Sequence, residues 1–414
     1  MKTTTIKEKT NRVSRAALWR NRDFMLLWSG QAVSSLGTTI TGTAYPLLVW
    51  DLSHSAALVG LVGGLGTLPY LFLSLIVGAL VDRWDRKRLM ILCDTGRAIN
   101  LASVLVMMVL GRLTVAQICA NTLIEGTFYV FFNLAEASCL PRVVSKEQIP
   151  LATSQNEATT GTTVLVGPAL GGALYTLSRS VPFLADAISY IVSVITLSFI
   201  KVPFQEQREA HQQRKLLAEI REGLSWLWHQ PLIRYIAFLT GGCNFIGAGL
   251  LPILLVLVKQ QHGSSLLYGT ILTIGGVGAI VGSLLGAPIQ KRFRFGPVII
   301  CTIWFEALCF PLYAIAPNPL LLGVISACLF VAGPIYNVVQ FSYRISLIPD
   351  ELQGRVNSVF RLLAFGFQPF GFALTGLLIQ WFQVVPAILF LSACAVFLAI
   401  LTSVNKHVIR AGRA

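Results

Sequence analysis

Long apolar segments recur along almost the whole chain, and they constrain its fold more than any other feature. A helix that crosses a bilayer needs about 20 largely apolar residues, and twelve segments meet this length. Only 12% of the residues are charged, and 55% are apolar. A soluble fold of 414 residues would carry about twice that charged fraction. The predicted spans cover residues 24–49, 56–81, 89–110, 114–137, 155–177, 182–201, 232–257, 265–289, 296–316, 319–343, 356–379 and 383–404. The sequence therefore predicts an all-α membrane protein.

Basic residues are distributed unevenly between the predicted loops. Arg112, Arg179 and Lys259 are the only ones of 32 Lys and Arg residues that fall in the loops on one side. Cytoplasmic loops carry the excess of Lys and Arg, so we expect both termini in the cytoplasm of a bacterium and a multi-pass protein in its inner membrane. The net charge of +14 then reports topology and does not indicate nucleic-acid binding.

The longest polar stretch divides the spans into two sets of six. Its second part, from Leu216 to Trp228, has amphipathic helical spacing and should lie along the membrane surface. We predict a basic tail (1–23), an N-terminal six-helix bundle (24–202), a cytoplasmic linker (203–231), a C-terminal six-helix bundle (232–405) and a short tail (406–414).

The two halves repeat a local pattern after the second span of each. Gly78-Ala79 precedes the charged segment 82–88, and Gly286-Ala287 precedes Gln290 and the basic segment 291–294. Parallel repeats of six spans related by an axis along the membrane normal occur in one large class of secondary transporters.

Several motifs resemble the major facilitator superfamily. The segment from Gly78 to Arg88 resembles the family's signature between spans two and three, with Asp85 where glycine is usual. Gly161, Gly167-Pro168 and Gly171-Gly172 resemble the fifth-span signature of drug–proton antiporters. A similarity to the macrolide-efflux and siderophore-exporter branch rests on segments 30–34, 68–70 and 354–356 and on Asp186. The resemblance implies twelve helices in two pseudo-symmetric six-helix bundles, alternating access, and export.

The fourth-span signature of this family contains an arginine four residues before a glycine. Here Thr122 stands four residues before Gly126, and Glu125 directly precedes the glycine. The arginine associated with proton coupling is thus absent from its usual position.

The resemblance also implies a cytoplasmic gate. Asp82 would accept hydrogen bonds from the start of span eleven, near Gly354 to Asn357, because the N-terminus of a helix favours an anion. Arg83 and Arg86 would pair with Asp85 or Glu136. The gate set is Gly78, Asp82, Arg83, Asp85, Arg86, Lys87, Arg88 and Glu136. The alternative is that these charges only set topology. Gln290 replaces Asp82 in the second copy, so the gate would be one-sided.

Small residues in span five predict a close helix contact. Gly167, Pro168, Gly171 and Gly172 would form a kinked contact with span eight, where Gly278, Gly282 and Gly286 have the same four-residue spacing. Such a contact could seal against ion leak, or it could be ordinary packing.

Three carboxyl groups at membrane depth are candidates for proton coupling: Glu125, Glu306 and Asp186. Each costs roughly 2.5–3.5 kcal/mol on insertion scales. Glu125 should be the best placed, and it could carry a proton or attract a cationic drug; the alternative is a protonated acid bonded to a neighbouring helix. Asp186 could simply reach water, and Asp94 should pair with Arg97, three residues away, in a structural role.

Polar side chains in the spans are candidates for a substrate cavity. They are Gln31, Asn121, Asn244, Tyr336, Asn337 and Gln340. Amides with aromatic neighbours suit a large amphipathic compound, although aromatic residues in spans more often serve packing.

These observations together predict a proton-coupled exporter of amphipathic organic compounds, of the macrolide or multidrug efflux kind. The alternatives are export of an endogenous siderophore or lipid-like molecule and, from another class, a non-transporting receptor or scaffold. The eight cysteines form no CxxC pair and the five histidines are scattered. We therefore expect no enzyme, no metal and no cofactor, with the proton gradient as energy source. The expected partners are a small substrate, protons and membrane lipid around a monomer.

Overall fold

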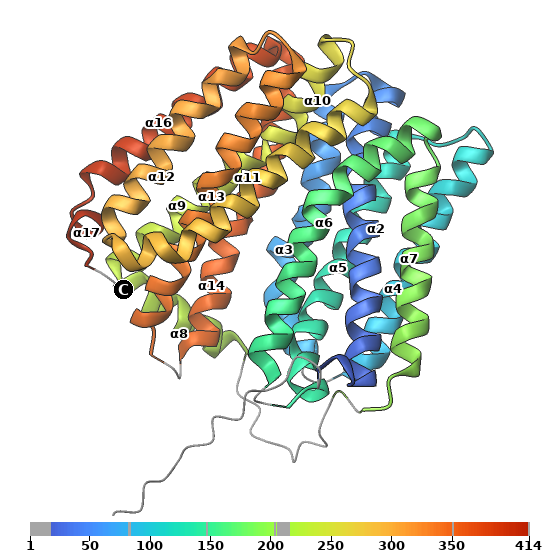
Figure 1. Ribbon diagram of the computed structural model, residues 1–414, viewed down its shortest axis with the longest axis horizontal. Coiled ribbons are helices and arrows are strands. Elements are labelled where there is room, and N and C mark those ends of the chain that lie inside the picture. Colours follow the sequence, from blue (N-terminus) through green and yellow to red (C-terminus); the bar gives the residue numbers. More distant parts are fainter. Residues whose placement is uncertain are drawn as a thin grey trace, which may run out of the picture.

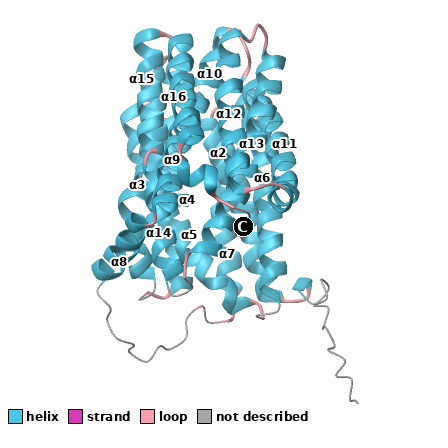
Figure 2. Cartoon of the chain, turned by 90° about the vertical axis from the view of Figure 1, so that its left-hand side faces the viewer, coloured by secondary structure: helices cyan, strands magenta, loops and turns pink. Residues whose placement is uncertain are grey.

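Helices form two groups that lean together at one end of the molecule. In this computed structural model, α2–α7 lie on one side and α9–α16 on the other, and the groups separate toward the end that carries α8 (Figure 1). The structure describes residues 18–81, 84–145, 148–202, 204, 216–349 and 352–412, and this part of the chain contains helices and no β-strand. Figure 2 shows the helices running roughly parallel in both groups.

The N-terminal group contains six long helices. These are α2 (Arg22–Ser53), α3 (Ala56–Val81), α4 (Arg86–Val109), α5 (Val115–Val143), α6 (Ile149–Leu177) and α7 (Val181–Phe199). The amphipathic α8 (Leu216–His229) follows, at the position predicted from its spacing.

The C-terminal group has the same plan with more interruptions. It comprises α9 (Pro231–Ala248), α10 (Leu250–Gln260), α11 (Ser265–Arg292), α12 (Phe295–Cys309), η2 (Phe310–Ile315), α13 (Pro319–Leu347), α14 (Gln353–Gly366), α15 (Gln368–Phe382), α16 (Val384–Val404) and α17 (Lys406–Arg410). Three predicted spans are therefore each divided into two shorter pieces. Prolines near the start of η2 and α15 explain two of the breaks, because proline lacks the backbone donor that a continuous helix needs.

Ten helical segments within the described residues are long and apolar enough to cross a membrane. Two further helices, α2 with 32 residues and α6 with 29, match them in length but are more polar. The predicted twelve spans thus correspond to ten strongly apolar segments and these two helices. Their polar side chains meet each other, since Trp28 donates to Thr159 (Nε1–Oγ1 2.9 Å) and Ser35 bonds to Thr163 (3.3 Å).

Two helix pairs join the groups: α6 packs on α11, and α3 packs on α15. Glycines allow the close approach in both. A Cβ added at Gly269 would collide with the carbonyl oxygen of Pro168, and one at Gly60 would collide with that of Phe372. Next to Pro168, the N–H of Ala169 in α6 donates to Thr273 of α11 (N–Oγ1 3.1 Å), which adds a hydrogen bond to the contact.

The predicted contact between spans five and eight is present, but it is made by other residues of α11. Gly172 meets Ser265 and Leu266. Gly278, Gly282 and Gly286 instead face α13, where added side chains would meet Ala327, Val331 and Val338. Gly167 and Gly171 pack on α2, against Thr39 and Ile40, and Gly161 borders open space. The four-residue spacing identified close packing correctly and assigned the wrong partner helix to the glycines of span eight.

Candidate functional site: a buried ion pair and two cavities

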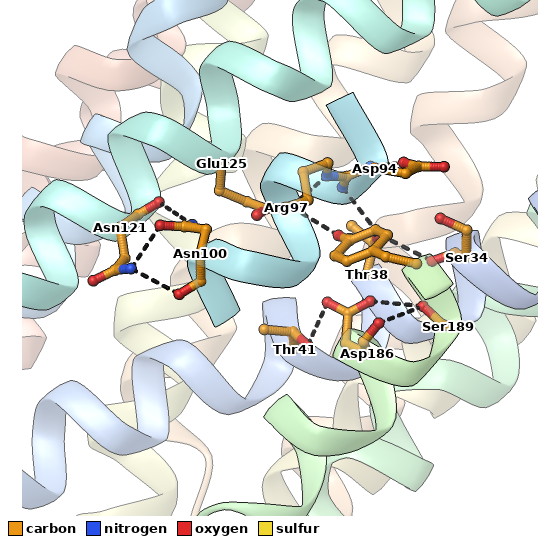
Figure 3. Close-up of polar contacts among 11 residues, drawn as sticks. Ser34, Thr38, Thr41, Asp94, Arg97, Asn100, Asn121, Glu125, Asp186 and Ser189 are labelled. Carbon is orange, nitrogen blue, oxygen red and sulfur yellow. Dashed lines mark hydrogen bonds and ion pairs between the residues drawn. The ribbon is translucent and has the colours of Figure 1, made fainter. Parts of the chain in front are cut away.

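Arg97 of α4 forms a buried ion pair with Glu125 of α5. Its Nε lies 2.6 Å from Glu125 Oε1, and the two side chains are 3% and 17% exposed. Arg97 Nη2 also donates to Thr38 Oγ1 of α2 (3.2 Å), and Tyr190 of α7 donates to the same Glu125 oxygen (2.7 Å). Thr38 and Tyr190 are themselves hydrogen-bonded (3.0 Å). One small network therefore joins four helices of the N-terminal group (Figure 3).

The fourth-span signature lacks its arginine here, but Glu125 of that span is paired with an arginine from the preceding long helix. Arg97 stands on the tyrosine ring of Tyr190, 4.1 Å from its centroid, which further fixes the guanidinium. The sequence predicts a pair of Arg97 with Asp94, three residues away. That ion pair exists at 3.6 Å, but it is the longer of the two. The sequence shows an arginine at membrane depth, which needs a buried partner. It does not show that this partner is Glu125, on the neighbouring helix.

Two more carboxyl groups lie in the same bundle. Asp186 is 1% exposed; its Oδ2 accepts from Thr41 (2.7 Å) and its Oδ1 from Ser189 (3.0 Å). The expectation that Asp186 could reach water is therefore wrong. Asp94 is fully buried and has its ion pair with Arg97 at 3.6 Å. Within the described part of the chain, neither Asp94 oxygen nor Glu125 Oε2 accepts a hydrogen bond.

A polar cavity of about 380 Å³ adjoins this network. Arg97 lines it together with Trp28 and Gln31 of α2, Tyr129 and Glu136 of α5, and Asn156 of α6. Glu125 is not among the lining residues and reaches the cavity through Arg97. The polar faces of α2 and α6 explain why these helices are less apolar than the other spans.

A second cavity of about 230 Å³ lies in the C-terminal group. Glu306 of α12 lines it with mostly apolar neighbours, including Phe310, Phe330 and Leu398. A single carboxyl group in such surroundings can attract one cation or hold one proton, and the aromatic rings can contact an apolar body.

Four of the six predicted cavity residues divide between these two places, and Asn121 and Gln340 line neither. Gln31 lines the N-terminal cavity, while Asn244, Tyr336 and Asn337 line the C-terminal one. Asn121 lines neither of the two: it is 4% exposed, and its amide donates to Asn100 and Ser103. Gln340 is also buried, at 4% exposure. Asn121 and its partner join α4 to α5, because a buried amide needs hydrogen-bond partners.

The described residues include only part of the predicted cytoplasmic gate. Asp82 and Arg83 lie outside the described residues, and Gly78 borders open space. Asp85 caps the start of α4 by accepting from the backbone of Arg88 (3.0 Å), and its ion pair is with Arg88 (3.6 Å). Lys87 donates to the carbonyls of Ser198 and Ile200 (3.1 and 2.6 Å), where a cation suits the end of α7. Glu136 faces the polar cavity.

An ionic cluster at the opposite end was missed in the sequence. Asp51, at the end of α2, accepts from Tyr175 (3.0 Å) and pairs with Arg179 (3.5 Å) and with Lys259 of α10 (3.4 Å). Nearby, Ser55 donates to Gln380 of α15 (3.0 Å). From the sequence, Arg179 and Lys259 indicate only on which side of the membrane their loops lie. The cluster joins the two groups at the end where they lean together.

A bundle of membrane-length helices in two similar halves, with a cavity in each half and a buried ion pair, is the architecture of a secondary transporter. The family model described as transmembrane secretion effector matches residues 13–413, so the chain belongs to this family of major facilitator transporters.

Curated relatives with transport names align over most of their length. The chain is 27% identical to the multidrug efflux pump Tap of Mycolicibacterium fortuitum, over 85% of this chain and 88% of the relative. It is 22% identical to macrolide efflux protein A of Streptococcus pyogenes (86% and 88%). It is 26% identical to the enterobactin exporter EntS of Citrobacter koseri (81% and 80%).

Solved structures of transporters share the fold. The nucleoside transporter NupG superposes with a TM-score of 0.73 at 17% identity, covering 94% of this chain and 99% of that one. A bacterial homologue of the lysosomal transporter Spinster, in an inward-facing and unoccupied conformation, gives 0.71 at 14% identity (93% and 97%). These likenesses confirm the major facilitator fold expected from the sequence motifs.

Proposed function

We propose that this protein is a proton-coupled exporter of amphipathic organic compounds, working by alternating access in a bacterial inner membrane with both termini in the cytoplasm. The observation that carries the proposal is the buried Arg97–Glu125 ion pair beside a polar cavity. The relatives named as a multidrug efflux pump and a macrolide efflux protein support export as the direction and a drug-like cargo.

Charge balance around Arg97 favours proton binding. One guanidinium can neutralise one carboxylate, whereas Asp94, Glu125 and Asp186 together supply three. A surplus of buried negative charge is unfavourable unless protons or other cations bind. The cluster therefore has a capacity for protons that one salt bridge would not create.

Protonation of Glu125 would change helix packing. A neutral carboxyl attracts Arg97 less, and the hydrogen bonds through Thr38 and Tyr190 would then rearrange. These residues belong to α2, α4, α5 and α7, so a proton would alter contacts across the whole N-terminal group. An inward proton gains about 2.3 kcal/mol per 100 mV of membrane potential, which can bias two arrangements of similar free energy.

In the predicted orientation, the contacts of Asp51 with Lys259 and of Ser55 with Gln380 close the external end. The C-terminal cavity, with Glu306 among aromatic and aliphatic side chains, would take an amphipathic compound. Proton binding in one bundle and cargo binding in the other are then coupled by rocking of the two groups.

Transport by purified protein in proteoliposomes, with a panel of amphipathic compounds and an imposed pH gradient, tests this proposal. We expect export by the parent protein to follow the gradient. Glu125→Gln should make transport insensitive to it, whereas the matched change Glu306→Gln should alter cargo affinity and keep the gradient dependence. Gradient-driven export at the parental rate by Glu125→Gln would contradict the proton assignment.

The similarity to enterobactin exporters supports a second candidate, export of an endogenous siderophore or lipid-like molecule. Counterflow of a catecholate siderophore in the same proteoliposomes distinguishes the two. Exchange of the siderophore with none of the drug panel would favour the second candidate.

A further inference from the structure

A third cavity opens on the outer surface of the C-terminal group. It has a volume of about 380 Å³ and lies between the end of α11, α12 and α13. Its lining is almost wholly apolar and includes Phe293, Pro297, Phe305 and Ile335. The hydroxyl of Thr302, one of its few polar groups, is already used by the carbonyl of Ile299 (2.9 Å). The groove therefore offers no hydrogen-bond pattern that could orient a polar cargo.

The groove has the length of a lipid tail in one leaflet. Its lining residues on α12 run from Pro297 to Phe305, which corresponds to about 12 Å at the helical rise of about 1.5 Å per residue. Half of a bilayer's hydrocarbon core is about 15 Å thick. Phe293, Cys301 and Phe305 are exposed on this face, as expected where a helix surface meets lipid.

Cations surround the end of the groove at the start of α12. Lys291 and Arg292 end α11, Arg294 caps α12, and all three are exposed. The N–H of Phe295 donates to the carbonyl of Gly412 (3.1 Å), so the C-terminal segment with α17 docks at the same place.

The docked segment adds Lys406 and Arg410, both exposed. No Asp or Glu occurs at positions 288–305 or 396–414. All charged side chains of these two segments are therefore basic.

We infer that this groove binds an anionic glycerophospholipid, with one acyl chain along α12 and the headgroup phosphate at Lys291 and Arg294. Basic pockets at the cytoplasmic ends of membrane helices recognise anionic headgroups in this way. The apolar lining of the groove suits the acyl chain of the lipid, and the basic residues beside it suit the anionic headgroup. This site lies apart from the Arg97 network and from both other cavities, and it does not depend on the transport proposal.

Cys301 provides a direct probe, because it lines the groove and is exposed, while Cys328 of α13 is exposed and does not line it. The full chain in detergent is alkylated with N-ethylmaleimide, and both cysteines are quantified by peptide mass spectrometry. Dioleoyl phosphatidylglycerol should slow alkylation of Cys301 relative to Cys328. Dioleoyl phosphatidylcholine should do so only at far higher concentration.

The double variant Lys291→Gln/Arg294→Gln should raise the half-protecting phosphatidylglycerol concentration about thirtyfold, since each cation near an anionic lipid contributes about 1 kcal/mol and tenfold equals about 1.4 kcal/mol. Arg20→Gln/Arg22→Gln makes the same charge change elsewhere and should have no effect. The inference would be overturned by any of three results: equal protection by both lipids, unchanged protection in the Lys291/Arg294 variant, or displacement of the lipid by inorganic phosphate alone.

Discussion

At the residue scale, Arg97 connects α4 with α5 and α2 inside the N-terminal group. It lies at 3% exposure between carboxyl groups on α4 and α5 and donates to α2. Breaking a buried pair by removing one partner leaves an uncompensated charge, which costs more than removing both.

Arg97→Gln should therefore lower stability by about 3–5 kcal/mol, because Glu125 is left unpaired inside the bundle. Thermal unfolding of the purified protein in detergent measures this loss. Arg97→Gln/Glu125→Gln should be more stable than Arg97→Gln alone, since one carboxylate fewer is left without its cation. If the double variant is no more stable than Arg97→Gln, Arg97 does not neutralise Glu125 in the folded protein.

At the scale of elements, glycines decide which helices can touch. The α6–α11 contact joins the two groups through Gly269, which approaches the backbone of Pro168 and Gly172. The backbone of α6 cannot move aside as a flexible side chain can, so the contact tolerates no added atom. A Cβ added at Gly161, on the same helix as Pro168, would meet no atom within 4 Å.

Gly269→Ala should destabilise the protein by about 1–3 kcal/mol, the usual cost of overpacking, and should slow transport by separating α6 from α11. Gly161→Ala is the matched control and should leave both properties near those of the parent. Unfolding midpoints and initial transport rates measured side by side check this. Equal behaviour of the two variants would show that the close contact is not needed.

At the scale of the whole molecule, the ion pair between Asp51 and Lys259 joins residues 208 positions apart and connects the two groups. Arg179 pairs with the same carboxylate from within the N-terminal group. Either substitution removes one cation from Asp51, but of these two cations only Lys259 belongs to the C-terminal group, so only its ion pair crosses between the groups.

Lys259→Gln should shift the equilibrium away from the arrangement closed at this end. The shift should reach about fivefold at most, since partly exposed ion pairs contribute about 0.2–1 kcal/mol. The rate of disulfide formation between Ser55→Cys and Gln380→Cys reports the closed arrangement, and it should fall in Lys259→Gln and stay nearly constant in Arg179→Gln. Similar rates of disulfide formation in Lys259→Gln and Arg179→Gln would show that Lys259 does not stabilise the closed arrangement.

By itself the sequence determined the membrane fold, its long helices and the family. Apolar runs of bilayer length can satisfy their backbone groups only as helices, and the motifs around Gly78 and Gly167 are local in the chain. The carboxyl groups at membrane depth were also visible, because their cost is a property of each residue. Only the tertiary structure decided how they are paired. Arg97 meets Glu125 across two helices, the glycines of α11 divide between α6 and α13, and Asp51 finds Lys259 across the two groups. These contacts depend on the rotation and crossing of packed helices, which periodicity along one helix does not specify.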